Sequence, residues 1–193
     1  MRPKTFMYRS KEYQYWRNNP GERIVEVPIF WDMISSYPAA DILEVGNVLA
    51  HYYEVHHIVV DKYEKSDNVI NEDALTFDIG KRYKLIISIS TIEHVGTLKD
   101  PPQDPAKTGK TLNHLKTLLA PGGKVMVSLP LGWNRNMDER IKAGIITFDK
   151  TYCLKRISAE NAWTEATWEG IKDAKYNKPF GGANGLLIGE IDG

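Results

Sequence analysis

The stretch from Asp41 to His51 constrains the fold of this chain more than any other. It reads DILEVGNVLAH, an apolar run that ends on Gly46 and continues into residues compatible with a helix. A buried parallel strand passes into a helix in this way at the carboxyl edge of an α/β sheet. Ligands of such sheets bind outside that edge, and a glycine lets the backbone approach them closely. We therefore expect a largely parallel sheet with a binding site beside Gly46.

Length and composition are those of a globular protein of one domain. The 193 residues are 42% hydrophobic and 26% charged, and a chain of this length buries about 70% of its unfolded surface. The formal net charge is zero, so no overall field attracts nucleic-acid phosphates or anionic lipid. A lone cysteine, Cys153, excludes an internal disulfide and any site built from several cysteines. We expect no nucleic-acid partner and no membrane partner.

The N-terminal segment is rich in aromatic residues up to a turn-forming run at 18–21. It lacks the apolar region of a signal peptide, and no window of the chain approaches 18 uninterrupted apolar residues. We therefore expect a soluble, cytoplasmic protein. The aromatic side chains either cover the core or close over a pocket, and a cover is favoured because aromatic residues mostly supply buried area.

Hydrophobic periodicity predicts the elements of the sheet. In chain order they are a helix at 22–37, strands at 41–45, 56–61, 69–70 and 84–90, a helix at 111–119, a strand at 124–129, a helix at 137–142, and strands within 151–157 and at 185–191. Pro28 interrupts the first helical pattern. Strands spaced by crossovers form a mainly parallel sheet. The final pair, with no obvious helix between its strands, predicts an antiparallel addition at one edge.

Carboxylates stand at or near the ends of the first four strands: Glu44, Asp61, Asp73 and Glu93. An acid at the tip of the second strand, here Asp61, can accept hydrogen bonds from both ribose hydroxyls of a nucleoside. The alternative is a solvated acid at a strand end. Asp73 either contacts an adenine or caps its own loop. These positions favour an adenosine-type ligand.

Five motifs between about residues 41 and 130 occur in a characteristic order: ILEVG, VVD, NEDALTFD, KLIISISTIEHVG and LLAPGGKVMVSLP. The series resembles that of class I S-adenosylmethionine-dependent methyltransferases. More narrowly, EVGNVLAHY, VVDKYE, ISISTIEHVG and ANGLLIGEI resemble small methyltransferase-like proteins associated with polysaccharide biosynthesis. The resemblance implies a doubly wound, mostly parallel seven-stranded sheet with an antiparallel last strand, and S-adenosylmethionine as cofactor.

The expected organisation is a single methyltransferase-like domain over residues 1–193. Residues 1–40 form an N-terminal cover and lead-in helix, residues 41–130 the cofactor-binding core, and residues 131–193 the C-terminal edge strands and acceptor-side loops. By the resemblance, the cofactor residues are Glu44, Gly46 and Asn47 at the methionine end, Asp61 on the ribose, Asp73 by the adenine, and Ser90, Thr91 and Glu93 under the sulfonium.

The first turn departs from the family pattern G-x-G-x-G, because Val48 stands where the second glycine is usual. A valine Cβ at that position is expected to crowd the backbone, so that either the loop is wider or the cofactor binds less tightly. Val48 therefore motivates an alternative function, a catalytically silent module with a binding or scaffolding role. The full G-x-G-x-x-G fingerprint is also absent, which argues against a nicotinamide dehydrogenase.

His94 is the candidate general base, since an imidazole with a pKa near 6.5 can take a proton from a hydroxyl or amine. The alternative is a histidine hydrogen-bonded beneath the element that follows. Glu93 and His94 are too few ligands for a divalent metal, so we expect no metal site. Trp133 and Asn134 offer a stacking face and a polar group to a sugar or another small polar molecule. The sequence thus predicts O- or N-methyl transfer to a small or glycan-linked acceptor.

Overall fold

A computed structural model describes residues 5–16 and 21–193 of the chain. Its strands are β1 (Thr5–Tyr8), β2 (Lys11–Gln14), β3 (Ile42–Val45), β4 (Ile58–Val60), β5 (Val69–Ile70), β6 (Tyr83–Ile89), β7 (Leu119–Pro130), β8 (Lys150–Arg156), β9 (Trp163–Ala166) and β10 (Gly185–Asp192). Its helices are α1 (Arg23–Ile34), α2 (Lys107–Thr117), α3 (Arg135–Lys142) and α4 (Trp168–Ile171), with short 3-10 turns η1 (Ala39–Asp41), η2 (Leu49–His51) and η3 (Ile92–His94).

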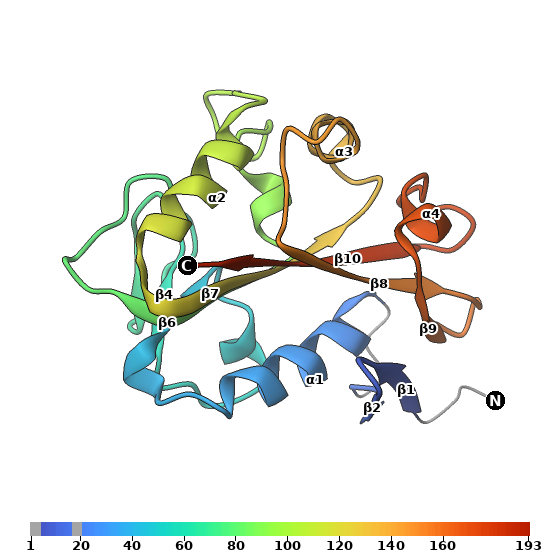
Figure 1. Cartoon of the computed structure of the whole chain (residues 1–193), viewed down its shortest axis with the longest axis horizontal. Coiled ribbons are helices and arrows are strands. Elements are labelled where there is room, and N and C mark those ends of the chain that lie inside the picture. The colour runs from blue at the N-terminus through green and yellow to red at the C-terminus, as the bar shows by residue number, and fades with distance from the viewer. Residues whose placement is uncertain (1–4, 17–20) are drawn as a thin grey trace.

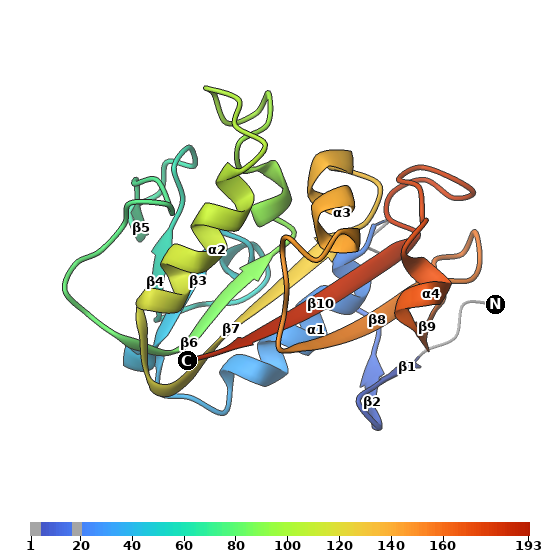
Figure 2. The ribbon, with the colours of Figure 1, turned by 45° about the horizontal axis from the view of Figure 1, so that its top comes forward.

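Eight strands form the central sheet in the order β5-β4-β3-β6-β7-β10-β8-β9 (Figure 2). The strands from β5 to β7 pair in parallel, and β10 runs antiparallel to both β7 and β8. The mostly parallel sheet with an antiparallel last strand is therefore confirmed. The strand count is eight rather than seven, because β9 pairs with the outer edge of β8. With only four residues, β9 is too short to give a clear alternating pattern in the sequence.

Helices cover both faces of the sheet. Figure 1 shows α2 and α3 on one face and α1 with the β1–β2 hairpin on the other. Residues of β6 alternate between two apolar cores, since Ile86 belongs to the core under α2 while Leu85 and Ile87 belong to the core over α1. Burial on both faces explains why residues 85–89 of this strand, LIISI, are apolar apart from Ser88.

Pro28 lies inside α1 and does not break it. A proline has no N–H to donate, so the carbonyl four residues earlier, that of Ile24, loses its helical partner. The backbone N–H of Trp16 donates to this carbonyl at 2.9 Å. A hydrogen bond from the N-terminal segment thus replaces the one that Pro28 cannot make.

The β1–β2 hairpin packs as a cover against α1 and β9. Phe6 and Tyr8 are buried in the core over α1, and the Tyr13 hydroxyl donates to Asp32 of α1 at 2.9 Å. The hydroxyl of Tyr15 accepts the backbone N–H of Trp163 at 2.7 Å. The expected turn lies mainly at 18–20, outside the described residues.

The helix expected after Gly46 is reduced to η2, one turn of 3-10 helix. The following residues pack as loop against α1 instead, where the Tyr53 ring stacks on Trp31 with centroids 3.8 Å apart. Aromatic residues have a low helix propensity, and the stacking with α1 favours a loop over the remaining tendency of this segment to form a helix. Of the described helices, none combines the length and the apolar character that a bilayer crossing requires.

Candidate functional site

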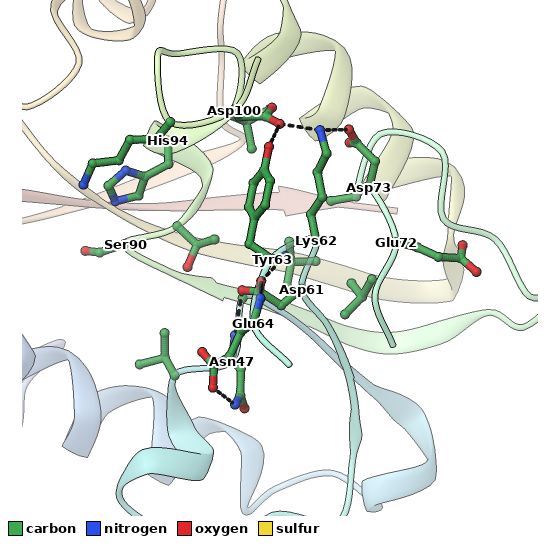
Figure 3. A pocket seen from close by; sticks show the side chains of 18 of the residues that line it. Asn47, Asp61, Lys62, Tyr63, Glu64, Glu72, Asp73, Ser90, His94 and Asp100 are labelled. Atoms are coloured by element: carbon green, nitrogen blue, oxygen red, sulfur yellow. Dashed lines mark hydrogen bonds and ion pairs between the residues drawn. The ribbon is translucent and has the colours of Figure 1, made fainter. Parts of the chain in front are cut away.

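A cavity of about 670 Å³ lies beyond the carboxyl ends of β3, β4 and β6 (Figure 3). This is where doubly wound sheets bind ligands, and the volume is within the usual range for small-molecule sites. Seven residues predicted from the sequence line it: Gly46, Asn47, Asp61, Asp73, Ser90, Thr91 and His94. The other four predicted residues, Glu44, Glu93, Trp133 and Asn134, lie outside its wall.

Gly46 makes the turn at the end of β3. Its φ angle is +89°, in the left-handed region that favours glycine. A Cβ at this position would lie 2.2 Å from Thr91 Oγ1, and the Gly46 N–H donates to the Val60 carbonyl at 2.8 Å. The turn therefore fits tightly between β4 and the end of β6, and only glycine satisfies it.

Val48 does not need to be a glycine. Its φ angle is −105°, which an L-residue adopts without strain. The side chain is 8% exposed and belongs to the core over α1, with its edge at the cavity wall. The turn thus accommodates the valine without backbone strain, while the side chain stays at the cavity wall.

Glu44 supports the turn from behind. Its carboxylate is buried and accepts backbone N–H groups of Val48 at 3.0 Å and Leu49 at 2.9 Å. The Nε2 atom of the buried His57 lies 2.7 Å from the other oxygen. Because both oxygens are used within the protein, Glu44 shapes the glycine turn rather than forming part of the cavity wall.

Asp61, directly after β4, retains capacity to accept hydrogen bonds. Its Oδ1 atom accepts the backbone N–H groups of Tyr63 and Glu64, both at 2.8 Å. Its Oδ2 atom has only a long contact of 3.4 Å with the N–H of Asn47. The backbone bonds fix the carboxylate at the cavity wall, and Oδ2 is the oxygen with lone pairs to offer.

Asn47 presents an unpaired acceptor at the same wall. Its side-chain N–H₂ donates to Glu64 at 2.5 Å, whereas its Oδ1 is buried without a hydrogen-bond partner in the described chain. A buried amide oxygen left unpaired is costly. A ligand that brings a hydroxyl or ammonium donor to this oxygen would remove that cost, so the wall fits a polar ligand.

A network of alternating charges closes one rim of the cavity (Figure 3). Lys62 and Lys107 both contact Asp73, at 2.9 and 2.7 Å, and Asp100, at 2.5 and 2.6 Å. The Tyr63 hydroxyl also donates to Asp100 at 2.6 Å. Burial opposes ionisation of Asp100, but the hydrogen bonds from the two lysines and the tyrosine outweigh it and hold its pKa well below the ordinary value.

Asp73 is committed to this network and to its own loop. Its Oδ2 receives both lysines, while Oδ1 accepts the backbone N–H of Leu75 at 3.0 Å. Asp73 therefore caps its own loop, one of the two alternatives considered for it, and it also lines the cavity, as contact with an adenine would require.

Ser90 and Thr91 lie at the end of β6. Ser90 has a φ of +40°, unusual for a residue with a side chain. Its hydroxyl donates to the buried Glu26 of α1 at 2.5 Å, and its backbone N–H is 3.2 Å from the Ser128 hydroxyl. Backbone strain of this kind concentrates at functional sites. The strained turn brings α1 and the ends of β6 and β7 together under the cavity.

Arg23, in the first turn of α1, lines the cavity and pairs with Glu26. Sequence analysis missed it, because an arginine at the start of a helix distant from the motifs carries no signal of its own. Glu93 lies behind this wall, 1% exposed, and burial raises its pKa well above the ordinary value. Its Oε2 atom has no hydrogen-bond partner in the part of the chain that the structure describes.

His94 lies at the boundary of the cavity. Burial, and then the positive charges of Lys99 and Arg23, lower its pKa to about 4. The ring is therefore neutral at pH 7. One nitrogen is 3.5 Å from Glu93, and the ring meets Trp133 edge to face at a centroid distance of 4.0 Å.

Trp133 and Asn134 line a second cavity, of about 680 Å³, which adjoins the first. The polar groups of Asn134 are already used: its N–H₂ donates to the Glu93 carbonyl at 2.8 Å, and its oxygen accepts the Met137 N–H at the start of α3. Trp133 is thus the member of the pair with a face to offer. Within residues 5–16 and 21–193, no three His, Cys, Asp or Glu side chains are grouped to hold a metal ion.

No protein-family model and no curated protein matches the sequence. Solved structures do match. One is the N-methyltransferase NodS from Bradyrhizobium japonicum WM9 in complex with S-adenosyl-L-homocysteine, 14% identical, with a TM-score of 0.55 over 91% of this chain and 89% of that one. This chain has the Rossmann-like methyltransferase fold. A second crystal structure of NodS matches the chain with a TM-score of 0.54 at 14% identity, over 92% of this chain and 98% of that one.

Proposed function

We propose that the chain is an S-adenosylmethionine-dependent methyltransferase that transfers a methyl group to oxygen or nitrogen of a small or glycan-linked acceptor. The observation that carries the proposal is the cavity at the strand ends, where the tight Gly46 turn faces Asp61 with one carboxylate oxygen still able to accept. The crystal structure of NodS, a methyltransferase of similar fold, contains S-adenosyl-L-homocysteine, which supports this choice of cofactor.

The residues at the cavity fit the parts of that cofactor. Asp61 would accept from the ribose hydroxyls, and the unpaired Asn47 oxygen would accept from the α-ammonium group. Arg23 would face the α-carboxylate, with its charge held in place by Glu26. Ser90 and Thr91 would form the floor. When bound, S-adenosylmethionine supplies a methyl group that is already activated for transfer.

The protein's own contribution is then orientation, exclusion of water and removal of a proton. His94 is neutral at pH 7 and lies between the two cavities, so it can accept the proton of an acceptor hydroxyl or amine. A pKa near 4 makes it a weak base, which suits a nucleophile that becomes strongly acidic as the new bond forms. The edge-to-face contact with Trp133 would orient the imidazole, and Nε2 would take the proton, because Nδ1 is buried.

The alternative of a silent binding module rested on crowding at Val48. The negative φ of Val48 and its packing into the core show no strain in the turn, which supports the methyltransferase proposal over this alternative. Turnover distinguishes the two functions directly, because a silent module would bind the cofactor and transfer nothing.

Calorimetry with S-adenosylmethionine and S-adenosyl-L-homocysteine tests the proposal. We expect both to bind, and Asp61→Ala to weaken binding by about 1.5–3 kcal/mol, the range for hydrogen bonds to a charged group. Asp67→Ala is the matched control, since Asp67 is an exposed acid of the neighbouring loop and lies outside the cavity wall. Failure of the wild-type protein to bind either compound at millimolar concentration refutes the proposal.

A further inference from the structure

The second cavity has an unusual charge composition. It lies between the loop after η3 and the start of α3, and its wall contains two cationic residues, Lys99 and Arg135, and no acidic residue. Trp133 supplies the aromatic surface, and the remaining polar groups are amides and hydroxyls. Such a wall offers hydrogen-bond donors and positive charge without a fixed counter-charge.

The neighbouring first cavity carries charges of both signs. Five carboxylates contribute to its wall: Asp61, Glu64, Glu72, Asp73 and Asp100. Lys99 and Val95 belong to both walls, so the two cavities meet at these residues. The charged side chains of the second cavity are therefore all cationic, whereas the first cavity has five carboxylates together with the cations Arg23, Lys62 and Lys99.

Lys99 and Arg135 are available for a ligand. Among the ion pairs of the described residues, none includes either side chain, whereas Lys62 and Lys107 nearby are fully paired with Asp73 and Asp100. Both residues are exposed, and the Lys99 ammonium lies 5.1 Å from the centre of the Trp133 ring. The ammonium thus lies over the Trp133 ring itself, where an anionic group on a molecule that packs beside it on the ring can contact the charge.

We propose that the second cavity binds the acceptor, and that the acceptor is a sugar carrying a carboxylate or a phosphate. The sugar ring packs on Trp133, and its anionic group is held by Lys99 and Arg135. This inference rests on the proposed methyltransferase function and narrows its substrate class.

The contact between Trp133 and His94 connects this site to the chemistry. His94 lines the first cavity, Trp133 lines the second, and their rings touch at a centroid distance of 4.0 Å. A sugar on Trp133 therefore has a hydroxyl or amine within reach of the candidate base. Its anionic group lies against Lys99 and Arg135, in a wall that has no carboxylate of its own.

Nuclear magnetic resonance of the full-length 22.0 kDa protein tests the inference directly. The indole N–H signal of Trp133 is assigned by its disappearance in Trp133→Phe. Glucose, glucuronate and glucose 1-phosphate are then titrated into protein saturated with S-adenosyl-L-homocysteine. We expect the two anionic sugars to shift this signal and to bind about tenfold or more tightly than glucose. The tighter of the two identifies the anionic group as carboxylate or phosphate.

Charge-removing variants provide the control. Lys99→Gln and Arg135→Gln should each weaken binding of the anionic sugars by about five- to tenfold, the effect of losing one exposed charge-assisted hydrogen bond, and leave glucose unaffected. Lys116→Gln removes an exposed lysine of α2 outside both cavity walls and should change nothing.

Several results would overturn the inference. One is that glucose binds as tightly as the anionic sugars, and another is that no sugar shifts the Trp133 signal. The others are that Lys116→Gln weakens binding as much as Lys99→Gln or Arg135→Gln, or that inorganic phosphate alone shifts the signal as much as the anionic sugars. Calorimetry with S-adenosyl-L-homocysteine separates this failure from that of the proposed function. If the cofactor product binds normally while anionic sugars show no preference, only the acceptor assignment is wrong.

Discussion

Substitution of Glu44 distinguishes a residue that shapes the cavity from one that contacts its ligand. The sequence places Glu44 at the methionine end of the cofactor, whereas the structure directs its carboxylate to Val48 N–H, Leu49 N–H and His57. Glu44→Ala leaves two backbone donors and an imidazole unpaired in a buried site. Glu44→Gln keeps an oxygen for the backbone donors and loses the charge.

The expected destabilisation follows from these contacts. Breaking a buried, hydrogen-bonded charge costs about 3–5 kcal/mol, so Glu44→Ala should lose that much free energy of unfolding. Glu44→Gln should lose about 1–2 kcal/mol, the difference between charged and neutral hydrogen bonds. With a urea m-value of roughly 2 kcal/mol/M, these losses shift the midpoint by about 1.5–2.5 M and about 0.5–1 M.

Urea unfolding without any ligand measures this effect, because a residue that acts only on the cofactor has little influence on the stability of the empty protein. Glu54→Ala is the control, since the Glu54 side chain is 87% exposed and should cost less than about 0.5 kcal/mol. If Glu44→Ala unfolds at the wild-type midpoint yet fails to bind S-adenosyl-L-homocysteine, Glu44 is a ligand residue and our interpretation is wrong.

Three further outcomes depend on burial of titratable groups. Burial, Lys99 and Arg23 lower the pKa of His94 to about 4, so kcat/KM should fall with an apparent pKa near 4, rather than 6.5, as the pH is lowered. The neutral ring also favours folding above pH 6.5, and this contribution to the free energy of unfolding is lost as the pH falls to 4. In urea unfolding, His94→Gln should abolish that loss. Burial raises the pKa of Asp138 to about 6, so the contribution of its protonated form to folding stability is present below about pH 4 and is lost as the pH rises through 6. Asp138→Asn should therefore raise the free energy of unfolding by about 1–3 kcal/mol at pH 8 and leave it unchanged at pH 4. Burial also raises the pKa of Cys153 to about 11, so an aromatic disulfide reagent at pH 8 should label the thiol at once in urea and very slowly in the native protein.

Much of the sheet was predictable because its strands are buried on both faces. The central runs of β6 (LIISI) and β7 (VMVSL) are apolar apart from one serine each, and the antiparallel β8–β10 pair was predicted because no obvious crossover helix separates these strands in the sequence. The β1–β2 hairpin was not predictable, since β2 is mostly exposed and polar. It depends on contacts with α1 and with β9, and β9 lies about 150 residues further along the chain.

The site divides in the same way. Gly46, Asp61, Ser90 and Thr91 were found because they follow strands, and the carboxyl ends of parallel strands meet at one edge. Arg23 reaches the cavity from a helix outside the motifs, and no local pattern marks it. For Glu44, the sequence showed an acid in the right strand but could not show which neighbouring groups would donate hydrogen bonds to its carboxylate.

The hydrogen bond from Trp16 to the Ile24 carbonyl links the beginning of the chain to the floor of the cavity. Helix α1 carries Arg23 and Glu26, yet it lacks one backbone hydrogen bond at Pro28, and the N-terminal segment supplies the replacement. The Ile24 carbonyl of the helix is therefore paired only when that segment is docked. A chain truncated after Trp16 would keep every residue of the cavity wall, yet the helix that carries Arg23 would lack the hydrogen bond to its Ile24 carbonyl.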